Sequence, residues 1–311
     1  MADVTDDYLA LRQEVGAVRL PRDVVRAAGP DTLTYLQGQL SQDLTPLALG
    51  ESTWAFLLEP QGKVVAWLRA TRTGDEEIVL DVDAGHGEPM IERLDRFKLR
   101  TDCTFEPVAW DCVAVRGPSA DGARPDPTAD VHVAVAGWPG LAGFDLLGPN
   151  VPLPDDVRDC GLDAYETVRI EAGVPAMGAE LTDKTIPHEV GRWVIVGSVS
   201  FTKGCYTGQE LVYRIDSRGG NVPRHLRGIV VGTNVLPPVG AEVVVEGQSM
   251  GALTSVGESL ERRAPVALGY IRRAVEPPAA AELRWNGTDG VPCTIEALPL
   301  VGDGDEPSVG D

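Results

Sequence analysis

The sequence lacks long apolar runs, is poor in aromatic residues and lysine, and carries a large excess of acidic residues. Aromatic residues make up 5% of the 311 positions, and 27 Lys and Arg stand against 47 Asp and Glu, a formal net charge of −20. No apolar run approaches the ~18 residues that a membrane-spanning helix needs. Phosphate neutralisation needs basic surface and base stacking needs aromatic rings, so the composition excludes a nucleic-acid-binding protein.

Cysteine and histidine are few and scattered. The five cysteines stand at positions 103, 112, 160, 205 and 293 without a CxxC pair, and the four histidines at 86, 132, 188 and 225. This spacing predicts neither a metal site nor a disulfide framework. The first residues, MADVTDDYLALRQE, lack the basic and apolar regions of a signal peptide, so we expect a protein of the reducing cytoplasm.

The signatures of several common enzyme classes are also missing. The chain contains no GxGxxG fingerprint, no GxxxxGK[ST] loop and no HExxH helix. The sequence therefore gives no motif support for dinucleotide-dependent hydride transfer, P-loop nucleotide hydrolysis or zinc hydrolysis.

What the sequence does contain is a pattern typical of a mixed α+β protein with an antiparallel sheet. Apolar residues at helical spacing predict helices after Gly29-Pro30-Asp31, near 88–99 and near 161–172, the last ended by Gly173. Alternating patterns predict strands at 18–28, 53–58, 63–71, 77–82, 103–106, 108–116, 131–136 and 143–147. The turn Glu59-Pro60-Gln61-Gly62 joins the second and third of these.

The chain divides into a larger region and a small barrel. Residues 117–130 form a loop with three prolines that separates two subregions of the first part, residues 1–225. From 226 to 311, six short apolar runs near 228–232, 241–246, 250–256, 266–272, 281–285 and 291–298 alternate with Gly, Pro and Asn-Gly turns. This spacing predicts a C-terminal antiparallel β-barrel.

One segment, residues 201–211, combines several chemical signals. Thr207 and Glu210 form a T-x-x-E capping box, which predicts a helix that begins at Thr207. Cys205 then lies beside the positive end of that helix and two residues from Lys203, and both features favour the reactive thiolate. We therefore interpret Cys205 as a reactive or ligand-contacting thiol; the alternative is a small buried apolar residue.

The charge around this segment is opposite to that of the whole chain. Between Lys203 and Arg227 there are five cationic and two anionic side chains, a net charge of +3. Such a stretch favours an anionic small molecule or partner tail, although a solvated helix with incidental arginines has the same composition.

The sequence from Lys203 to Glu210, KGCYTGQE, resembles the KGCYxGQE signature of the YgfZ-type folate-binding proteins, relatives of the glycine-cleavage T-protein (aminomethyltransferase). Further stretches resemble the same family: 29–43, PQGK at 60–63, the RxExGxPxxG stretch at 169–178, IPHE at 186–189, 251–255 and 267–269. The resemblance implies a T-protein-like cloverleaf with ferredoxin-like antiparallel sheet elements and the C-terminal barrel.

The resemblance also implies a cofactor and its contacts. Tetrahydrofolate, or another reduced folate, would lie in the central opening, with Glu171 bonded to the pterin and the cationic stretch facing the glutamate tail. From the residues alone, Glu171 could equally form a surface ion pair with Arg169. The candidate folate-binding residues are Glu171, Tyr206, Gln209, Glu210, Arg214 and Arg227, and the candidate reactive pair is Cys205 with Lys203.

One departure from the family bears on activity. T-proteins carry an Asp pair after the first hairpin turn, and this chain has Val65 and Ala66 at the positions we take as equivalent. Neither side chain can carry a proton, so aminomethyl transfer is not expected. The resemblance implies instead support for the maturation or repair of iron–sulfur proteins, with enzymes or assembly proteins of that class as partners.

Three interpretations follow: a folate-dependent accessory factor for iron–sulfur proteins, a folate-dependent one-carbon transferase, and a plain binding module. Because clusters are usually held by four cysteines, any cluster contact of this chain would be shared with a partner.

Overall fold

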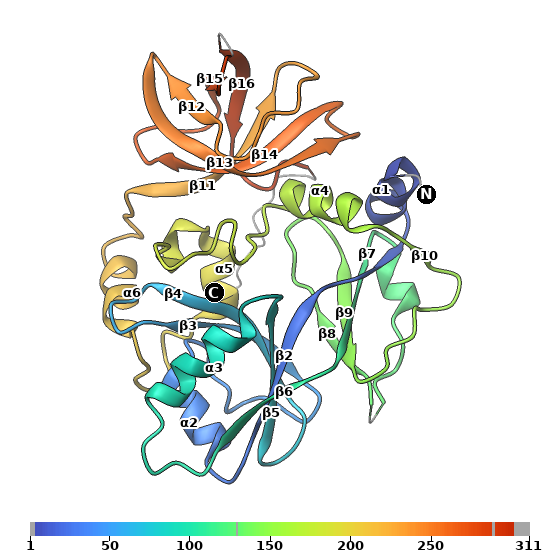
Figure 1. Cartoon of the computed structure of the whole chain (residues 1–311), viewed down its shortest axis with the longest axis vertical. Coiled ribbons are helices and arrows are strands. Elements are labelled where there is room, and N and C mark those ends of the chain that lie inside the picture. Colours follow the sequence, from blue (N-terminus) through green and yellow to red (C-terminus); the bar gives the residue numbers. More distant parts are fainter. Residues whose placement is uncertain (1–3, 129, 288–289, 302–311) are drawn as a thin grey trace.

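The computed structural model describes residues 4–128, 130–287 and 290–301. Two five-stranded sheets and a closed barrel form three lobes, with the barrel at the top of Figure 1 and the sheets below it. Six α-helices lie among them in the described part of the chain. The predicted α+β class, the antiparallel sheets and the six-stranded C-terminal barrel are confirmed.

The first sheet is wholly antiparallel and has the order β3-β4-β5-β2-β6. Its strands are β2 (Arg22–Ala28), β3 (Ser52–Leu58), β4 (Val64–Arg72), β5 (Glu77–Asp83) and β6 (Thr104–Val108). Helices α2 (Thr32–Gln39) and α3 (Gly87–Arg96) contribute Leu36, Met90 and Leu94 to its apolar core. The β3–β4 turn is closed by a 2.7 Å hydrogen bond from the Gly62 N–H to the Glu59 carbonyl.

The second sheet has the order β10-β1-β7-β9-β8, and only the β1–β10 pair is parallel. Its strands are β1 (Gly16–Arg19), β7 (Asp111–Arg116), β8 (His132–Val135), β9 (Gly143–Gly148) and β10 (Arg158–Asp159). Helices α1 (Val4–Gln13) and α4 (Leu162–Ala172) pack on it through Tyr8, Leu11 and Val168. As predicted, Gly173 ends α4 in the left-handed conformation, with φ of 71°.

The barrel closes in the order β11-β14-β13-β12-β15-β16. Its strands are β11 (Arg224–Val231), β12 (Glu242–Val245), β13 (Gln248–Ser259), β14 (Ala264–Arg272), β15 (Ala279–Arg284) and β16 (Val291–Glu296). Strand β13 runs against α4 so closely that a Cβ on Gly257 would lie 2.8 Å from Thr167 Oγ1. The barrel is therefore packed tightly onto the helix beneath it (Figure 1).

A central apolar cluster joins the barrel to the first sheet. It combines Phe56 and Trp67 of that sheet with Leu268 and Tyr270 of the barrel. Helices α5 (Arg192–Ser198) and α6 (Gln209–Asp216) and the short 3-10 helix η2 (Pro187–Glu189) lie between these parts; a second 3-10 turn, η1 (Ala120–Ala123), lies in the proline-rich loop. The lobes thus share buried packing rather than only linkers.

Two local predictions are wrong. The pattern at 18–28 predicted one strand, but β1 and β2 belong to different sheets, and Pro21 between them has no N–H to extend a ladder. The helix predicted from Thr207 begins two residues later, after Gly208 in a left-handed conformation with φ of 85°. A Cβ on Gly208 would lie 2.6 Å from the Glu59 carbonyl, so close packing on the β3–β4 turn sets this helix start.

Candidate functional site

A cavity of about 410 Å³ opens where the chain passes from the second sheet to the first. Its lining comes from the crossover at 20–22, from β3, β4 and the end of β5, from Arg116, Trp138 and Asp145, from α4 and from the loop at 174–177. Segments far apart in the sequence therefore meet at one hollow, as is common for small-molecule sites.

Two aromatic pairs contribute to the lining. Trp54 and Trp67 are stacked, with ring centroids 4.4 Å apart and an interplanar angle of 23°. Trp138 and Tyr165 form a tilted pair at 5.3 Å, and the Arg116 guanidinium lies 4.4 Å from the Trp138 ring centroid. Aromatic faces of this kind suit a flat heterocyclic ligand.

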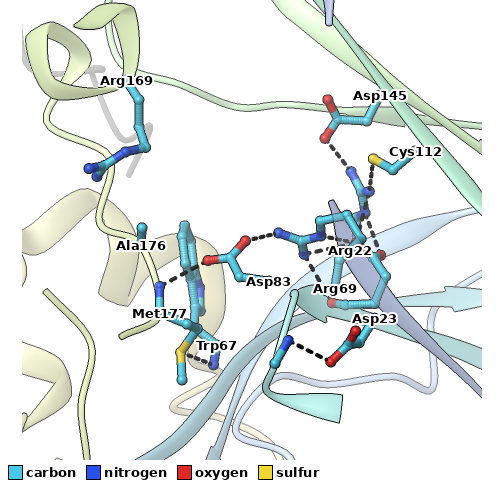
Figure 2. Close-up of polar contacts among 12 residues, drawn as sticks. Arg22, Asp23, Trp67, Arg69, Asp83, Cys112, Asp145, Arg169, Ala176 and Met177 are labelled. Carbon is cyan, nitrogen blue, oxygen red and sulfur yellow. Dashed lines mark hydrogen bonds and ion pairs between the residues drawn. The ribbon is translucent and has the colours of Figure 1, made fainter. Parts of the chain in front are cut away.

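Asp83, at the end of β5, brings a carboxylate to the cavity (Figure 2). Its Oδ1 accepts a hydrogen bond from Arg22 Nη1, and its Oδ2 accepts one of 2.9 Å from the Met177 backbone N–H. Asp83 thus ties β5 to the crossover and to the 174–177 loop, and 34% of its side chain stays accessible. Figure 2 shows it between these two partners.

A buried chain of charges leads from Asp83 to the second sheet, with three arginines alternating with three aspartates. Arg22 contacts both Asp83 and Asp81, and Arg69 forms two hydrogen bonds with Asp81, of 2.9 and 3.1 Å. Arg69 Nη1 then bonds Asp145 Oδ2 at 2.6 Å, across the two sheets. The chain ends where Arg116 Nη1 lies 2.7 Å from Asp145 Oδ1.

The charges of this network compensate one another. Burial on its own would raise the pKa of Asp145, but the adjacent Arg116 and Arg69 outweigh it and hold that pKa at about 2. Burial raises the pKa of the neighbouring Cys112 thiol to about 12. Cys112 is therefore an inert thiol beneath the cavity.

A second buried carboxylate, that of Glu180, supports the cavity loop from behind the lining residues. Glu180 Oε2 accepts hydrogen bonds of 3.0 Å from Arg169 Nη1 and from the Ala176 N–H. Its Oε1 accepts hydrogen bonds of 2.6 Å from the hydroxyls of Thr254 and Ser255 on β13. Glu180 thus fixes α4, the cavity loop and the barrel relative to one another.

The residues of the KGCYTGQE segment do not line this cavity. Cys205 is exposed, whereas the other four cysteines are buried, so the interpretation of Cys205 as a small buried residue is wrong. Lys203 Nζ donates to the carbonyls of residues 37, 40 and 42, at 2.7, 2.8 and 2.9 Å. Burial lowers the pKa of Lys203 to about 8. The three hydrogen bonds nevertheless use all three N–H donors of the ammonium form. Lys203 therefore anchors the end of α2, and its ammonium is engaged there rather than with the Cys205 thiol.

The other residues predicted in this region are spread over the surface and the core. Tyr206 is buried, its ring centroid lies 5.4 Å from Lys203 Nζ, and its N–H donates to Gln209 Oε1 at 3.2 Å. Glu210 and Arg214 are exposed. Arg227 is half-buried beside Trp193 in a separate pocket of about 200 Å³.

Glu171, which the resemblance assigns to the pterin, lies away from the cavity. Its side chain is fully buried (0% exposed), does not line the cavity, and accepts a 2.6 Å hydrogen bond from the Tyr8 hydroxyl. Arg12 of α1 lies 3.5 Å away. Burial raises the pKa of Glu171. The reason is the helical period: Tyr165, Glu166 and Arg169 form the cavity face of α4, and Glu171 points away from it. A surface ion pair is excluded as well.

The expectation that Val65 and Ala66 supply no acid stays a prediction. Both contact the core of the first sheet, and neither lines the cavity. The residue of β4 that does line it is Trp67, whose side chain points to the opposite face from that of its neighbour Ala66. Trp67 carries no ionisable group, so β4 still supplies no acid to the cavity.

The cavity residues Arg22, Asp83, Trp138 and Tyr165 were missed by the sequence reasoning. A usable signal was present, since Arg69 and Asp81 stand between apolar residues within β4 and β5. A charge at a buried strand position needs a partner, and several such charges indicate a buried polar network. Among the described residues, no group of His, Cys, Asp or Glu could hold a metal ion, and no helix is long and apolar enough to span a membrane.

Comparisons with known proteins bear on the class. The fold matches the crystal structure of the glycine cleavage system aminomethyltransferase T from Bartonella henselae, with a TM-score of 0.78 and 22% identity, over 96% of this chain and 89% of that one. The chain therefore has the aminomethyltransferase T fold.

Sequence similarity points the same way. The chain is 26% identical to an aminomethyltransferase of Thermus thermophilus over 333 residues, covering 96% of this chain and 90% of that protein. It is 24% identical to an aminomethyltransferase of Streptomyces avermitilis (89% and 83% covered) and 27% identical to an uncharacterized protein of Haemophilus influenzae (64% and 67% covered). No protein-family model matches. Sequence and fold together support a place in the aminomethyltransferase-like superfamily.

Proposed function

We propose that the chain binds a reduced folate, tetrahydrofolate or a derivative, in the cavity between the two aromatic pairs. The observation that carries this proposal is the combination of Trp54–Trp67 and Trp138–Tyr165 with an accessible carboxylate on Asp83. A pteridine ring is flat, apolar on its faces and rich in N–H donors at its edge, so it is complementary to such a hollow. The aminomethyltransferase fold supports the same ligand.

The proposed role of the bound folate is to support iron–sulfur enzymes or their assembly proteins, with Cys205 as the point of contact. Cys205 is the exposed cysteine, and Cys103, Cys112, Cys160 and Cys293 are buried and dispersed through the fold. This supports a thiol that meets a partner or a cluster held by a partner, because a stable cluster usually needs four cysteine ligands.

A one-carbon transferase is the second candidate, favoured by the names of the similar proteins from Thermus and Streptomyces. Aminomethyl transfer would need an acid at the reacting part of the folate, and the resemblance places that acid on the strand after the first hairpin turn. That strand, β4, presents Trp67 to the cavity. The carboxylate of Asp83 at the end of β5 is held by Arg22 and the Met177 N–H, and both observations support the accessory role. Turnover of an aminomethyl or methyl donor with tetrahydrofolate would overturn that preference.

Folate binding is tested by calorimetry with 5-formyltetrahydrofolate, a stable reduced folate. We expect saturable binding by the wild-type protein and roughly tenfold weaker binding after Trp138→Ala, which removes one ring of an aromatic pair. The matched control is Trp110→Ala, since Trp110 stacks on His132 and does not line the cavity. Absence of binding by the wild type, or equal weakening by both variants, would contradict the proposal.

The role of Cys205 is tested separately. In the folded protein, iodoacetamide is expected to modify Cys205 alone, because the other four thiols are shielded from solvent. Cys205→Ala is expected to leave the melting temperature unchanged and to abolish support of iron–sulfur enzymes in a strain that depends on this protein. Normal client activity with Cys205→Ala would remove the accessory role of this thiol while leaving folate binding intact.

A further inference from the structure

Strand β8 is an edge strand of the second sheet, and one side of it has no strand partner in the described part of the chain. Its other side pairs with β9, and just beyond β8 the Ala136 N–H bonds the Gly143 carbonyl at 3.0 Å. In an antiparallel ladder, residues that bond the partner strand alternate with residues whose backbone groups point away from it. The backbone of Ala134 therefore faces β9, and the N–H and carbonyl groups of Val133 and Val135 point to the open side.

A groove of about 890 Å³ runs beside this strand. All four residues of β8 line it and no residue of β9 does, so it lies on the open side. The rest of its lining comes mainly from the segments 47–52 and 124–128. Val135 and Leu49 both line the groove and are 60% and 62% exposed. Unpaired backbone groups and exposed apolar side chains thus share one groove, whose further walls suit a single extended chain better than the surface of a folded domain.

The other open sheet edges of the described chain are protected against the addition of a strand. Edge strand β6 contains Glu106 and Pro107, and a proline cannot donate to a ladder. The outer side of β3 is partly occupied, since the Ser41 N–H bonds the Phe56 carbonyl at 3.0 Å. Strand β10 has only two residues. Strand β8 has the sequence HVAV, without proline, lysine, arginine or a carboxylate, so it lacks the features by which proteins block an edge.

One charge in the groove is unbalanced. Its charged lining residues are Arg124 and Glu51. The Glu51 carboxylate accepts a 2.8 Å hydrogen bond from the Ala48 N–H. The Arg124 side chain is exposed and has no ion pair or hydrogen bond with another described residue. Such a free cation, in a chain with a net charge of −20, favours an acidic residue in the ligand.

We propose that the groove along β8 is a docking site for an extended segment of a partner protein, with apolar residues at alternate positions and an acidic residue that meets Arg124. The segment adds to the second sheet as a sixth strand, bonded to the backbone of Val133 and Val135. In this mode of recognition the main-chain bonds supply affinity, and the alternate side chains supply specificity by covering Val135 and Leu49. The docking site is independent of the proposed folate site, because no residue of β8 lines the cavity.

The test begins with a random library of phage-displayed peptides selected on the full-length protein. The recovered peptides are expected to carry apolar residues at alternate positions and an Asp or Glu. The best peptide is then synthesised in two N-methylated forms, one methylated at its odd positions and one at its even positions. Only one of the two forms is expected to bind, by a factor of about ten or more in fluorescence anisotropy, because only alternate N–H groups of an added strand face β8.

Three variants test the groove itself. Val135→Pro removes an N–H from the open side of β8 and leaves the bonds to β9 in place, so it is expected to keep the fold and to weaken the unmodified peptide about tenfold or more. The matched control, Val135→Thr, keeps the N–H and the branched shape and is expected to bind like the wild type. Arg124→Glu is expected to weaken the acidic peptide by a similar factor. Near-ultraviolet circular dichroism of each variant monitors the fold.

Failure to enrich any peptide, equal binding of the two methylated forms, or full binding by Val135→Pro would overturn the docking site. An unchanged affinity with Arg124→Glu would overturn the acidic residue of the ligand. Light scattering tests the other possible occupant: a wild-type dimer that Val135→Pro dissociates would assign the groove to a second copy of this chain instead of a partner. The two methylated peptides decide the matter on the wild-type protein even if Val135→Pro does not fold.

Discussion

Replacing Arg69 by methionine is expected to lower the free energy of unfolding by about 3–5 kcal/mol. Arg69 is 1% exposed, and its guanidinium bonds Asp81 through two nitrogens and Asp145 through the third. Methionine fills a similar volume but pairs with neither carboxylate. The loss is large because two buried negative charges then lose a shared partner, not because a surface ion pair is removed.

The same substitution is expected to weaken folate binding. Asp81 and Asp145 also hold Arg22 and Arg116, and both of these arginines line the cavity. Loss of Arg69 therefore leaves Asp81 with Arg22 and Asp145 with Arg116, each with one arginine partner instead of two. The cavity walls that contain Arg22 and Arg116 are then no longer joined through Arg69. Urea unfolding gives the change in stability. Calorimetry with 5-formyltetrahydrofolate gives the change in affinity; it is done without urea, at a temperature at which the variant is folded.

A matched control is available on the same sheet. Arg26 of β2 pairs with Glu77 of β5 at 2.7 Å, but the two side chains are 45% and 33% exposed. Arg26→Met is expected to cost less than about 1 kcal/mol, as is typical of exposed ion pairs. An equally small loss for Arg69→Met would mean that the buried network contributes no stability beyond that of a surface pair.

The strands, the barrel and the end of α4 could be predicted because their signals are local. Alternating side chains and turn residues specify the β3–β4 hairpin, and the left-handed Gly173 ends α4. Which sheet a strand joins is not a local property. The segment at 18–28 alternates throughout, yet its two halves pair with β7 and β5 in different sheets.

Helix α5 shows a different limit of the sequence pattern. Its sequence, RWVIVGS, is a short apolar run with two valines and an isoleucine, residues that favour strands. It is helical because Val194 and Ile195 pack into the central cluster, against Phe56 and the barrel. Packing in the tertiary structure therefore outweighs the strand preference of these residues, and this packing cannot be read from the local sequence.

The functional site shows the same contrast between local signals, which the sequence reveals, and contacts between distant segments, which it does not. KGCYTGQE is a continuous motif, so Lys203 and Cys205 could be singled out, and the structure separates them into an anchored ammonium and an exposed thiol. The cavity is built from segments more than 100 residues apart, such as Arg22 and Tyr165. No spacing rule connects such positions, and only the sheet crossover brings them together.

Replacing Glu180 by glutamine is expected to cost about 3–5 kcal/mol of stability, comparable to the loss of Arg69. Glu180 is fully buried, and its two oxygens accept four hydrogen bonds. Glutamine keeps the shape but presents an NH2 group to two of these four donors. Arg169, with 5% of its side chain exposed, would keep only Glu166 as an ionic partner.

The damage is expected to reach the cavity as well as the barrel. The donors to Glu180 come from Arg169 on α4, from Ala176 in the cavity loop and from Thr254 and Ser255 on β13. Chemical unfolding followed by tryptophan fluorescence measures the stability. Titration with 5-formyltetrahydrofolate measures whether the cavity loop has lost its position, and weaker binding is the expected result.

Glu282→Gln provides the comparison, because Glu282 is 52% exposed and pairs with Arg284 on the surface of the barrel at 2.9 Å. It is expected to change stability by less than about 1 kcal/mol and folate affinity not at all. If Glu180→Gln behaves like Glu282→Gln, then Glu180 does not couple the barrel to the cavity. If it lowers stability but leaves affinity unchanged, Glu180 fastens the barrel to α4, and the position of the cavity loop does not depend on it.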